Sequence, residues 1–404
     1  MDYTAYEVEQ YIRETDVKFI RLAFCDVFGR RKNIAIMPDE LQRAFTIGIA
    51  FDASAVDGFG CAVHSDLLLH PDPATLTGLP WRPDSGRVVQ MFCDITYPDG
   101  KPFECDTRAL LKRTVADAEA ADCRFFFGSE LEFYLFKTDE NGNPTSVPLD
   151  RAGYMDVAPD DRGENVRREI CLNLEKMGVL PESSHHEQGP GQNEVDFRYS
   201  DPLTAADGAV MFKTVVKTAA ARNGLAADFS PKPLAGEPGS GFHINMSCSC
   251  HRIADPMQGL IAGIMAYARE ISLFLNPTSA SYERLGGNKA PGYVSWSHEN
   301  RSQLIRVPAA EGQYRRIELR SPDCGANPYI AFSLLMRAGM SGMLDALPLA
   351  DACDLDLYSA SPEQLSALKK LPRSLDEATR LALGSEFVAS SLPAQLIDAY
   401  ANRA

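Results

Sequence analysis

The stretch HHEQGPGQNE, residues 185–194, gathers metal-binding side chains around a Gly-Pro-Gly turn. His185, His186 and Glu187 precede the turn, and Glu194 follows it. Imidazole nitrogens and carboxylate oxygens are common protein ligands of divalent metals. A polar loop whose histidines hydrogen-bond locally explains this stretch equally well, so a metal site needs support from elsewhere in the chain.

A pair of glutamates provides part of that support. GSELEFYLF, residues 128–136, has the aromatic and apolar content of a strand, and Glu130 and Glu132 are two residues apart in it. Residues i and i+2 of a strand point to the same face, so the two carboxylates would lie a few ångströms apart. Each carboxylate of such a pair raises the pKa of the other unless a cation lies between them. An exposed polar strand face is the simpler explanation if the pair stands alone.

Two further strand-like segments add an imidazole, a carboxylate and arginines. His243 lies in GSGFHINMS, and Glu318 lies in RRIELRSPD between Arg316 and Arg320. The Arg-x-Glu-x-Arg alternation is typical of a cross-strand salt-bridge ladder, or of a metal-binding carboxylate between anion-binding arginines. Many oxygen ligands with a single imidazole suit Mg²⁺ or Mn²⁺ better than zinc.

NRSQLIRVP adds Arg301 and Arg306. Many arginines beside many carboxylates, in an acidic chain, indicate a site that holds phosphate through divalent metals.

The bulk composition excludes several classes of function. The chain has 404 residues and a formal net charge of −15, with 45% hydrophobic and 24% charged residues. It contains no run of five or more Lys/Arg, so we expect no nucleic-acid partner. The polar N-terminus lacks a signal peptide and no apolar stretch reaches about 18 residues, so we expect no membrane partner and a cytoplasmic location. The ten scattered cysteines are typical of free thiols, and the Cys248–Cys250 spacing does not match a zinc site.

The elements that must position these residues form an α+β pattern, because strands and helices do not alternate regularly. Residues 18–36 predict a β-hairpin with its turn at Phe28-Gly29-Arg30, and residues 88–98 predict a strand. Residues 70–86 predict a long structured loop. Residues 107–121 predict a helix with Thr107 as its N-cap. A boundary near residue 105 therefore divides the chain into domains 1–104 and 105–404.

The residues resemble the glutamine synthetase family over nearly the whole chain. Eight segments occur in the family's order, namely FDASAVDGF, SDLLLHPDPATL, GSELEFYLF, HHEQGPGQNEVDF, KPLAGEPGSGFHINMS, NPTSASYERL, NRSQLIRVP and RRIELRSPDCGANPYIAF. The resemblance implies an N-terminal β-grasp domain and a larger catalytic α+β domain with a creatine-kinase-like antiparallel sheet. It also implies a homo-oligomeric hexameric ring or double ring, with active sites between subunits.

The resemblance also implies the metal ligands. The first metal would be bound by Glu132, Glu187 and Glu194, and the second by Glu130, His243 and Glu318. His185 and His186 match the family and would be structural.

The remaining site residues carry over in the same way. Arg284 and Arg320 match positions for the substrate carboxylate and the acyl phosphate. Nucleotide phosphates and the transferred phosphoryl group would be bound by Arg301, Arg306 and Arg316. Glu182 and Ser247 fall at nucleotide-contact positions.

The implied reaction has two steps. ATP phosphorylates the γ-carboxylate of glutamate, and an amine then displaces phosphate to form an amide. A carboxylate is a poor electrophile until its oxygen becomes a leaving group, and two metals with several arginines neutralise the charge of phosphoryl transfer. Such a ligase would serve nitrogen metabolism.

The departures from the family pattern lie mainly in the ammonium pocket. Asp52, Tyr154 and Glu187 are retained, but Ala55 replaces a serine, and the flap RLGGNKAP is one residue shorter with Lys289 at its glutamate position. At roughly 4 Å and an effective dielectric near 20, an inward Lys289 would oppose ammonium binding by about 4 kcal/mol. If Lys289 turns to solvent instead, the site is merely more open.

Other departures concern the acid substrate and the assembly. Pro238-Gly239 replaces an Asn-Gly that usually holds the amino acid, and Asn245 replaces a second histidine. The sequence does not match the family's final segment, which joins two rings in bacterial members, so a single hexameric ring and a double ring both stay open. Tyr358 lies near a position that some members adenylylate, although an ordinary loop tyrosine is the simpler explanation.

Three hypotheses follow. The first is an ATP-dependent ligase of this family that joins glutamate or a related acid to an amine other than ammonia. The second is glutamine synthetase itself. The third is a non-catalytic ring-forming relative, which the complete set of six predicted metal ligands argues against, because unpaired buried carboxylates destabilise a fold.

Overall fold

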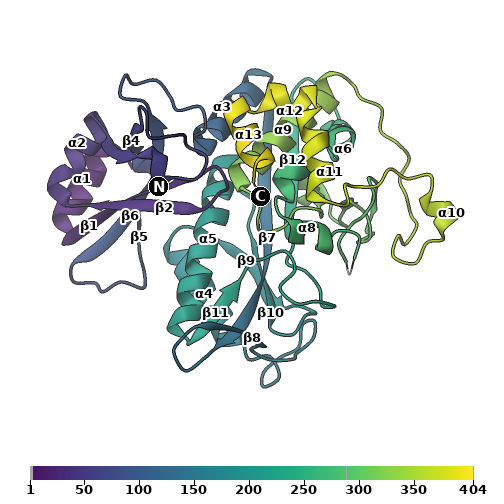
Figure 1. Cartoon of the computed structure of the whole chain (residues 1–404), viewed down its shortest axis with the longest axis horizontal. Helices are drawn as coiled ribbons and strands as arrows, with labels where there is room; N and C mark the ends of the chain where they lie inside the picture. The colour runs from purple at the N-terminus through teal and green to yellow at the C-terminus, as the bar shows by residue number, and fades with distance from the viewer. Residues whose placement is uncertain (1–2, 288, 404) are drawn as a thin grey trace.

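The computed structural model of the chain describes residues 3–287 and 289–403 (Figure 1). Two sheets lie side by side, the smaller one from the N-terminal part of the chain and the larger one at the centre of the molecule. Helices cover the top of the large sheet and one of its sides, and the strands β8, β10 and β11 extend below them (Figure 1). This mixture of sheets and segregated helices confirms the α+β expectation.

The N-terminal sheet has the strand order β2-β1-β6-β4-β3, with β5 added to β6. The elements of this part are α1 (Ala5–Glu14), β1 (Val17–Cys25), β2 (Arg31–Ile36), α2 (Leu41–Thr46), β3 (Ile49–Asp52), β4 (Asp66–Pro71), β5 (Thr77–Gly78) and β6 (Arg87–Thr96). β1 and β2 pair antiparallel as the predicted hairpin, and β6, the predicted strand at residues 88–98, pairs parallel with β1. The segment at residues 70–86 forms a connection that includes the short strand β5.

The large sheet has the order β13-β14-β15-β12-β7-β10-β9, with β8 and β11 also paired to β7. Its strands are β7 (Cys123–Thr138), β8 (Pro144–Pro148), β9 (Pro181–His186), β10 (Gln192–Phe197), β11 (Leu225–Asp228), β12 (Phe242–Cys250), β13 (Trp296–His298), β14 (Ile305–Val307) and β15 (Ile317–Leu319). Its helices are α3 (Thr107–Ala120), α4 (Glu164–Lys176), α5 (Pro202–Arg222), α6 (Pro256–Tyr267), α7 (Ser272–Leu275), α8 (Ser279–Arg284), α9 (Pro328–Leu344), α10 (Pro362–Leu365), α11 (Leu375–Leu383), α12 (Glu386–Ser391) and α13 (Ala394–Ala401).

The predicted cap of α3 was wrong by one residue. The side chain of Asp106, not Thr107, accepts hydrogen bonds from the backbone N–H groups of Arg108 and Ala109, and Thr107 is the first helical residue. Aspartate caps helices as well as threonine does, so the sequence Asp-Thr offers two adjacent candidates.

The core lies between the large sheet and its helices. Phe127 of β7 stacks on Phe332 of α9, with ring centroids 4.1 Å apart. Farther along β7, Phe133 meets Phe212 of α5 edge-on at 5.9 Å. α5 and α9 therefore cover the same face of β7, and the opposite face is left for polar side chains.

A buried ion cluster joins the two parts of the chain. Arg108 at the start of α3 is 4% exposed and forms ion pairs with Asp72, Asp94 and Asp207 at 3.0, 3.2 and 2.9 Å. Asp94 belongs to the N-terminal sheet and Asp207 to α5. The hydroxyl of Tyr329 in α9 also donates to Asp207 at 2.6 Å. Removing one partner of such a network leaves buried charge uncompensated, so the cluster fixes this junction.

No helix in the described part of the chain is long and apolar enough to cross a membrane. The ten cysteines are free, and none of them belongs to a metal-competent cluster of the described residues.

Candidate active site

The alternation of β7 places the two predicted glutamates away from the core. Phe127, Leu131 and Phe133 are fully buried on the helix-covered face. Glu130 and Glu132 point to the opposite face, as the period of two requires. The sequence prediction of two neighbouring carboxylates on one strand face is therefore correct.

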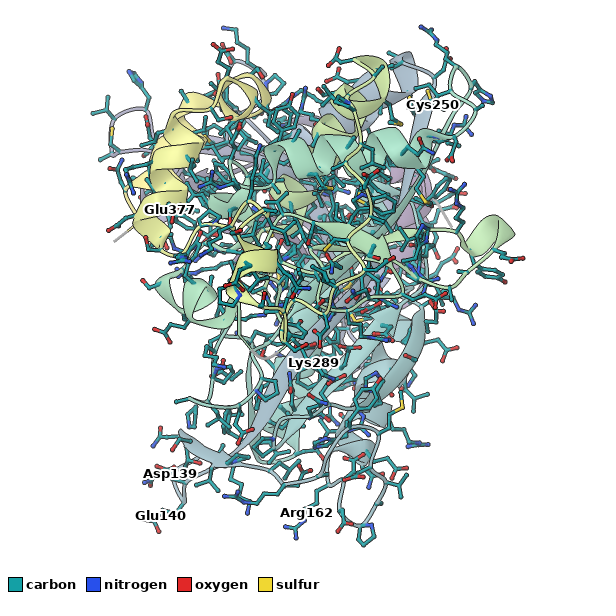
Figure 2. All side chains as sticks on the ribbon, turned by 90° about the vertical axis from the view of Figure 1, so that its right-hand side faces the viewer. Asp139, Glu140, Arg162, Cys250, Lys289 and Glu377 are labelled. Carbon is teal, nitrogen blue, oxygen red and sulfur yellow. The ribbon has the colours of Figure 1, made fainter. Side chains whose placement is uncertain are left out.

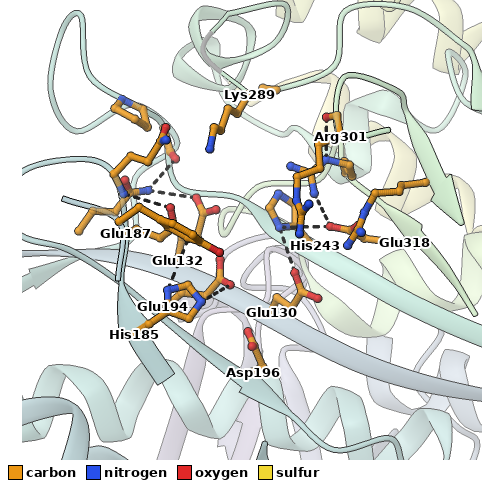
Figure 3. A pocket seen from close by; sticks show the side chains of 18 of the residues that line it. Glu130, Glu132, His185, Glu187, Glu194, Asp196, His243, Lys289, Arg301 and Glu318 are labelled. Carbon is orange, nitrogen blue, oxygen red and sulfur yellow. Dashed lines mark hydrogen bonds and ion pairs between the residues drawn. The ribbon is translucent and has the colours of Figure 1, made fainter. Parts of the chain in front are cut away.

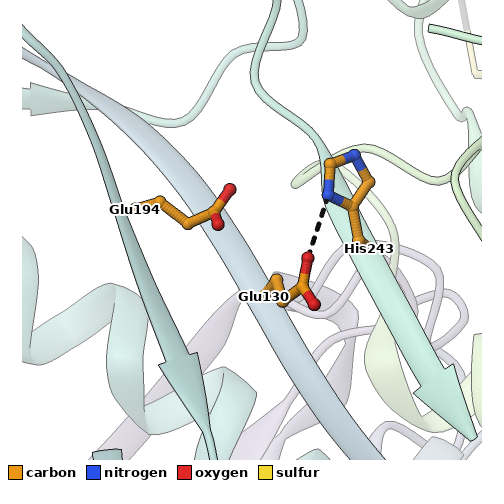
Figure 4. Close-up of side chains that lie close together, drawn as sticks. All are labelled: Glu130, Glu194 and His243. Atoms are coloured by element: carbon orange, nitrogen blue, oxygen red, sulfur yellow. Dashed lines mark hydrogen bonds and ion pairs between the residues drawn. The ribbon is translucent and has the colours of Figure 1, made fainter. Parts of the chain in front are cut away.

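The register of the sheet then aligns polar residues from two more strands, β10 and β12, with this pair. Glu194 of β10 is directly opposite Glu132, and Asp196 is opposite Glu130. His243 of β12 is opposite Glu130 on the other side. Figure 4 shows the side chains of Glu130, Glu194 and His243 projecting from three adjacent strands into one space. Cross-strand neighbours of this kind have Cβ atoms about 5 Å apart, which is close enough to share a metal ion.

These side chains line one pocket of about 300 Å³ (Figure 3). The residues predicted from the sequence that line it are Glu130, Glu132, Tyr154, Glu187, Glu194, Gly239, His243, Arg284, Arg301, Arg306, Arg316, Glu318 and Arg320. Glu132, Glu187 and Glu194 gather on one side of the pocket, and Glu318 lies with the arginines on the other.

Three predicted site residues do not line this pocket. Asp52 ends β3 in the N-terminal sheet, where its side chain accepts from the backbone N–H and the hydroxyl of Ser54 at 2.9 and 2.7 Å. Glu182 is exposed on β9, and Ser247 lies farther along β12 opposite Phe126. Roles for Glu182 and Ser247 would require a ligand that extends beyond the pocket, and a role for Asp52 would require a second chain.

The glutamates on either side of the Gly-Pro-Gly turn are held near an imidazole. The two ring nitrogens of His185 lie 3.6 Å from Glu187 and 3.4 Å from Glu194. Burial and the charge of Glu132 raise the pKa of Glu187 to about 7, and the same causes raise the pKa of Glu194 well above its ordinary value. Several buried carboxylates that repel one another are stabilised by a cation. Because oxygen ligands dominate, the residues fit Mg²⁺ or Mn²⁺.

The second predicted ligand group contains His243, Glu130 and Glu318. The Nδ1 of His243 lies 3.3 Å from Glu130 and 3.8 Å from Glu318. Burial and the nearby Arg320 lower the pKa of His243 to about 4, so the ring is neutral at physiological pH, as a metal ligand must be. Glu318 also forms ion pairs with Arg306 and Arg320.

This arrangement corrects one expectation about the arginines. The sequence pattern placed Arg316 and Arg320 on both sides of Glu318. The second partner of Glu318 is instead Arg306, its neighbour across the strand pair. The Nε of Arg316 donates to Asn245 at 3.0 Å, and the amide of Asn245 donates to Glu130 at 2.6 Å. Asn245 thus links a phosphate-binding candidate to a metal-ligand candidate.

The neighbouring His186 has a different role. Its Nε2 lies 2.9 Å from the carboxylate of Asp150, which also accepts from the backbone N–H of Gly191 at 3.0 Å. Asp161 nearby forms an ion pair with Arg167. These buried contacts fix the turn between Glu187 and Glu194, so His186 is structural, as the resemblance implied.

Sequence reasoning missed Asp196 and undervalued His185. Both line the pocket, and burial with the charge of Glu130 raises the pKa of Asp196 to about 7. The signal for Asp196 was present, because it stands two residues after Glu194 in NEVDF and therefore shares its strand face. His185 faces the pocket because it is opposite Glu194 in the β9–β10 pairing.

Glycine permits the close approach of Arg284 to the loop before β12. A Cβ at Gly239 would lie 2.4 Å from the carbonyl oxygen of Pro231 and 2.8 Å from Cγ of Arg284. The guanidinium of Arg284 donates to the carbonyls of Ser321 and Arg320 at 2.8 and 3.2 Å. Arg284 is therefore held rigidly at the edge of the pocket.

Lys289 faces the pocket. Its ammonium group lies 5.5 Å from the ring centroid of Tyr154, within the range of a cation–π contact, and it lines the pocket with Tyr154 and Glu187. Figure 3 shows the side chain descending from the loop above the carboxylates, with its nitrogen directed toward them. In Figure 2 the same residue lies at the waist of the molecule, between the helical half and the strands below.

A second cavity of about 930 Å³ adjoins the pocket. It shares Tyr154, Pro238 and Lys289 with the pocket, and Tyr293 and Leu357 supply apolar surface. Tyr358 also lines it, and its hydroxyl donates to the carbonyl of Arg301 at 3.2 Å. The contact connects this tyrosine to the arginine side of the pocket.

Comparison with known proteins assigns the chain to a family. Residues 16–98 match "Glutamine synthetase, beta-Grasp domain", and residues 104–404 match "Glutamine synthetase, catalytic domain". The chain is 41% identical to the glutamine synthetase of Clostridium saccharobutylicum, with 96% of this chain and 91% of that protein covered. It is also 41% identical to the glutamine synthetase of Methanosarcina mazei, with 98% and 92% covered.

The fold agrees with solved structures of a protein named GmaS. A structure named "GmaS/ADP complex-Conformation 1" superposes with a TM-score of 0.88 at 28% identity, covering 99% of this chain and 94% of that one. A structure named "Apo GmaS without ligand" gives 0.87 at 28% identity, with 98% and 93% covered. Together with the profile matches over both parts of the chain, these likenesses show that the protein is a carboxylate–amine ligase of the glutamine synthetase family.

Proposed function

We propose that the protein is an ATP-dependent ligase that joins the γ-carboxylate of glutamate, or of a related acid, to an amine other than ammonium. The bond would form through an acyl phosphate. The orientation of Lys289 carries this proposal. A positive charge in the pocket beside Tyr154 and Glu187 opposes a small cation such as ammonium at the same place.

The adjoining cavity supports a larger amine. Ammonium needs little space and several acceptors, whereas a substituted amine needs room for its substituent. The cavity of about 930 Å³ opens next to Lys289 and offers Tyr293 and Leu357 as apolar contacts. A substituent with apolar or anionic character therefore fits better beside Lys289 than a bare ammonium ion does.

The chain's own groups fit the two chemical steps. Mg²⁺ or Mn²⁺ held by Glu132, Glu187 and Glu194, and by Glu130, His243 and Glu318, would neutralise phosphate charge during phosphoryl transfer. Arg306 and Arg320 lie against Glu318 at the opposite side of the pocket, where they would bind and orient phosphate oxygens. Arg284 would hold the carboxylate of the acid substrate at the edge formed by Gly239.

The amine must lose a proton before or during its attack on the acyl phosphate. Glu187 lies beside Tyr154, but with metal bound its carboxylate would serve as a ligand. We therefore assign the role of proton acceptor to Asp52 of an adjacent subunit, with Glu187 and Tyr154 lining the place of the amine.

The likeness to GmaS supports the proposed nucleotide, and the place of Asp52 supports the proposed assembly. The name of one GmaS structure includes ADP, which supports ATP as the phosphoryl donor here. Glu182 and Ser247 would then contact the nucleotide beyond the pocket. Asp52 lies outside the pocket of its own chain, which supports a ring of identical subunits in which each N-terminal domain completes the neighbouring site.

Glutamine synthetase using ammonium is the second candidate. The identity of 41% to two proteins named glutamine synthetase favours it. In that case Lys289 would move away from the pocket when substrates bind.

Phosphate release from ATP in the presence of glutamate and Mg²⁺ separates the two candidates. The proposal predicts weak release with ammonium and strong release with at least one member of a panel of primary amines, polyamines and amino acids. Release with ammonium at least equal to that with every other amine would establish the second candidate instead.

A further inference from the structure

A cationic groove lies on the opposite side of the large sheet from the active site. It has a volume of about 900 Å³ and is formed by the tip of the β1–β2 hairpin, one face of α5 and the C-terminal end of the chain. Figure 1 shows these three segments side by side near the centre of the molecule. The cations that line it are Arg30, Arg31, Lys213, Lys217, Arg222 and Arg403, and no acidic side chain lines it among the described residues.

This concentration of charge is unusual for the chain, whose formal net charge is −15. Lys213 and Lys217 are four residues apart on α5, and Thr214 and Thr218 share their face of the helix. Like charges at this spacing destabilise an isolated helix by about 0.2–0.5 kcal/mol. The helix therefore carries an unfavourable pair directed into the groove.

Only two of the six cations have a carboxylate partner within 4.0 Å among the described residues. Arg30 forms an ion pair with Asp57 at 3.0 Å, and Arg222 forms one with Glu169 at 3.4 Å. The remaining four are not neutralised in this way, so a net positive charge is left for a ligand.

The four other cations make contacts with neutral groups. Lys213 donates to the carbonyl of Cys324 at 2.5 Å, and Lys217 lies 6.0 Å from the ring centroid of Phe229. Arg403 stacks over Phe28 at 4.3 Å, and Arg31 donates to the side-chain oxygen of Gln90. The Nε of Arg31 and the Nη1 of Arg403 are buried and have no hydrogen-bond partner among residues 3–287 and 289–403. Buried donors without partners cost free energy, so both favour a bound acceptor.

Burial makes these charges responsive to an anion. It lowers the pKa of Lys213, of Arg31 and of Arg403, because each cation is partly removed from water. A multiply charged anion in the groove would compensate these cations for the hydration that burial removes. The low local dielectric would strengthen the attraction between the anion and the cations.

We propose that this groove binds a small polyanion bearing phosphate or carboxylate groups. The concave shape and the volume suit a small molecule, whereas nucleic acid would require an extended basic surface on this acidic chain. The ligand would contact Lys217 and Arg403 at the rim and the hydroxyl groups of Thr214 and Thr218 on α5.

The groove is joined to the active site by three hydrogen bonds through Cys324. Lys213 holds the carbonyl of Cys324, and the thiol of Cys324 donates to the backbone carbonyls of Glu132 and Gly241, each at 3.3 Å. A ligand that attracts Lys213 would act on the segment that positions Glu132, a predicted metal ligand. We therefore expect binding in the groove to change the affinity of the active site for metal.

Calorimetry on the metal-free, full-length protein tests the binding. Sulfate represents tetrahedral phosphate-like anions and succinate represents dicarboxylates. We expect saturable binding of at least one probe, weakened at least tenfold by Lys217→Gln and by Arg403→Gln. Arg113→Gln, an exposed arginine on α3 outside the groove, is the matched control and should leave the affinity unchanged. If neither probe saturates, or if both groove variants bind like the wild type, the proposal is wrong.

A second titration tests the coupling. The affinity for Mn²⁺ is measured with saturating sulfate and with sodium chloride at the same ionic strength. We expect at least a threefold difference in the wild type and none in Lys217→Gln. Equal Mn²⁺ affinities in the wild type, in the presence of proven sulfate binding, would refute the coupling and leave the site without influence on the metals.

Discussion

The ammonium group of Lys289 lies 5.5 Å from the ring centroid of Tyr154, at the junction of the pocket and its adjoining cavity. The family resemblance places a flap glutamate at position 289 and pairs it with this tyrosine around ammonium. The substitution therefore reverses the charge at one wall of the amine site, while all six metal-ligand candidates line the same pocket.

Replacing Lys289 should change the preference for the amine. Lys289→Glu removes the repulsion of a cation and adds an acceptor, so the KM for ammonium should fall at least tenfold, equivalent to about 1.4 kcal/mol. Lys289→Met, which removes the charge without adding an acceptor, should give a smaller decrease. Steady-state kinetics with ammonium measures both. An unchanged KM in Lys289→Glu would show that Lys289 does not govern the amine site.

Glu132 should be essential for metal binding. Its carboxylate accepts from the backbone N–H of Gly241 at 2.6 Å and from the side chain of Gln192 at 3.2 Å, which orients it toward the pocket. Glu132→Gln should weaken Mn²⁺ binding at least tenfold in calorimetry, because it removes a charge and an oxygen ligand. Glu182→Gln, an exposed glutamate outside the pocket, is the control. Equal affinities in the two variants would exclude Glu132 as a ligand.

The titration of Glu187 should increase the free energy of unfolding of the metal-free protein as the pH falls from 8 to 5. Its folded-state pKa is about 7, above the ordinary value of 4.5, because of burial and Glu132. Above pH 7 the folded state carries an unfavourable ionised group. Between pH 7 and 4.5 the folded state binds the proton more tightly than the unfolded chain, and the penalty disappears.

Glu187→Gln tests this sign. In the absence of metal the variant should raise Tm at pH 8 by about 1–3 °C, and it should have a smaller effect at pH 5. Added Mn²⁺ should stabilise the wild type more than the variant. A lower Tm of the metal-free variant at pH 8 would contradict the predicted repulsion.

Asp150 should act by positioning the turn between Glu187 and Glu194. Asp150→Ala leaves the imidazole of His186 and the N–H of Gly191 without their acceptor. We expect a loss of stability of roughly 1–3 kcal/mol in denaturant unfolding and a weaker affinity for Mn²⁺. Asp160→Ala, at an exposed aspartate in the same connection, should change neither measurement. Intact Mn²⁺ affinity in Asp150→Ala would show that the turn does not position the ligands.

Gly239→Ala should disturb the acid-binding edge without affecting the metals. The added Cβ would approach the carbonyl oxygen of Pro231 to 2.4 Å and would displace Arg284. Phosphate release with the best amine should fall at least tenfold, while Mn²⁺ affinity stays within twofold of the wild type. Gly78→Ala, where a Cβ meets nothing within 4 Å, is the matched control. Full activity of Gly239→Ala would contradict the assigned place of the acid substrate.

Sequence periodicity was sufficient to predict the central face of the site. The spacing of Glu130 and Glu132 in an apolar strand leaves one arrangement in which aromatic residues are buried and carboxylates are not. The same rule applied to Glu194 would have found Asp196. The sequence could not show that Arg306, and not Arg316, pairs with Glu318, because this depends on which strand lies beside β15.

Other features depend on contacts that local sequence does not determine. The direction of Lys289 is set by a loop that packs against Tyr154, more than one hundred residues away in the chain. The position of His185 between two glutamates follows from the β9–β10 register. Asp52 lies in a different sheet, and its place near any active site depends on the assembly of subunits.

The most direct test of the central claim is a competition between amines in a single reaction. The enzyme is incubated with ATP, Mg²⁺, glutamate, ammonium and an equimolar panel of primary amines, polyamines and amino acids, and the products are identified by mass spectrometry. The account predicts an N-substituted γ-glutamyl amide as the main product, at least tenfold above glutamine. Glutamine as the main product would contradict the account and would identify the protein as an ammonium-dependent glutamine synthetase.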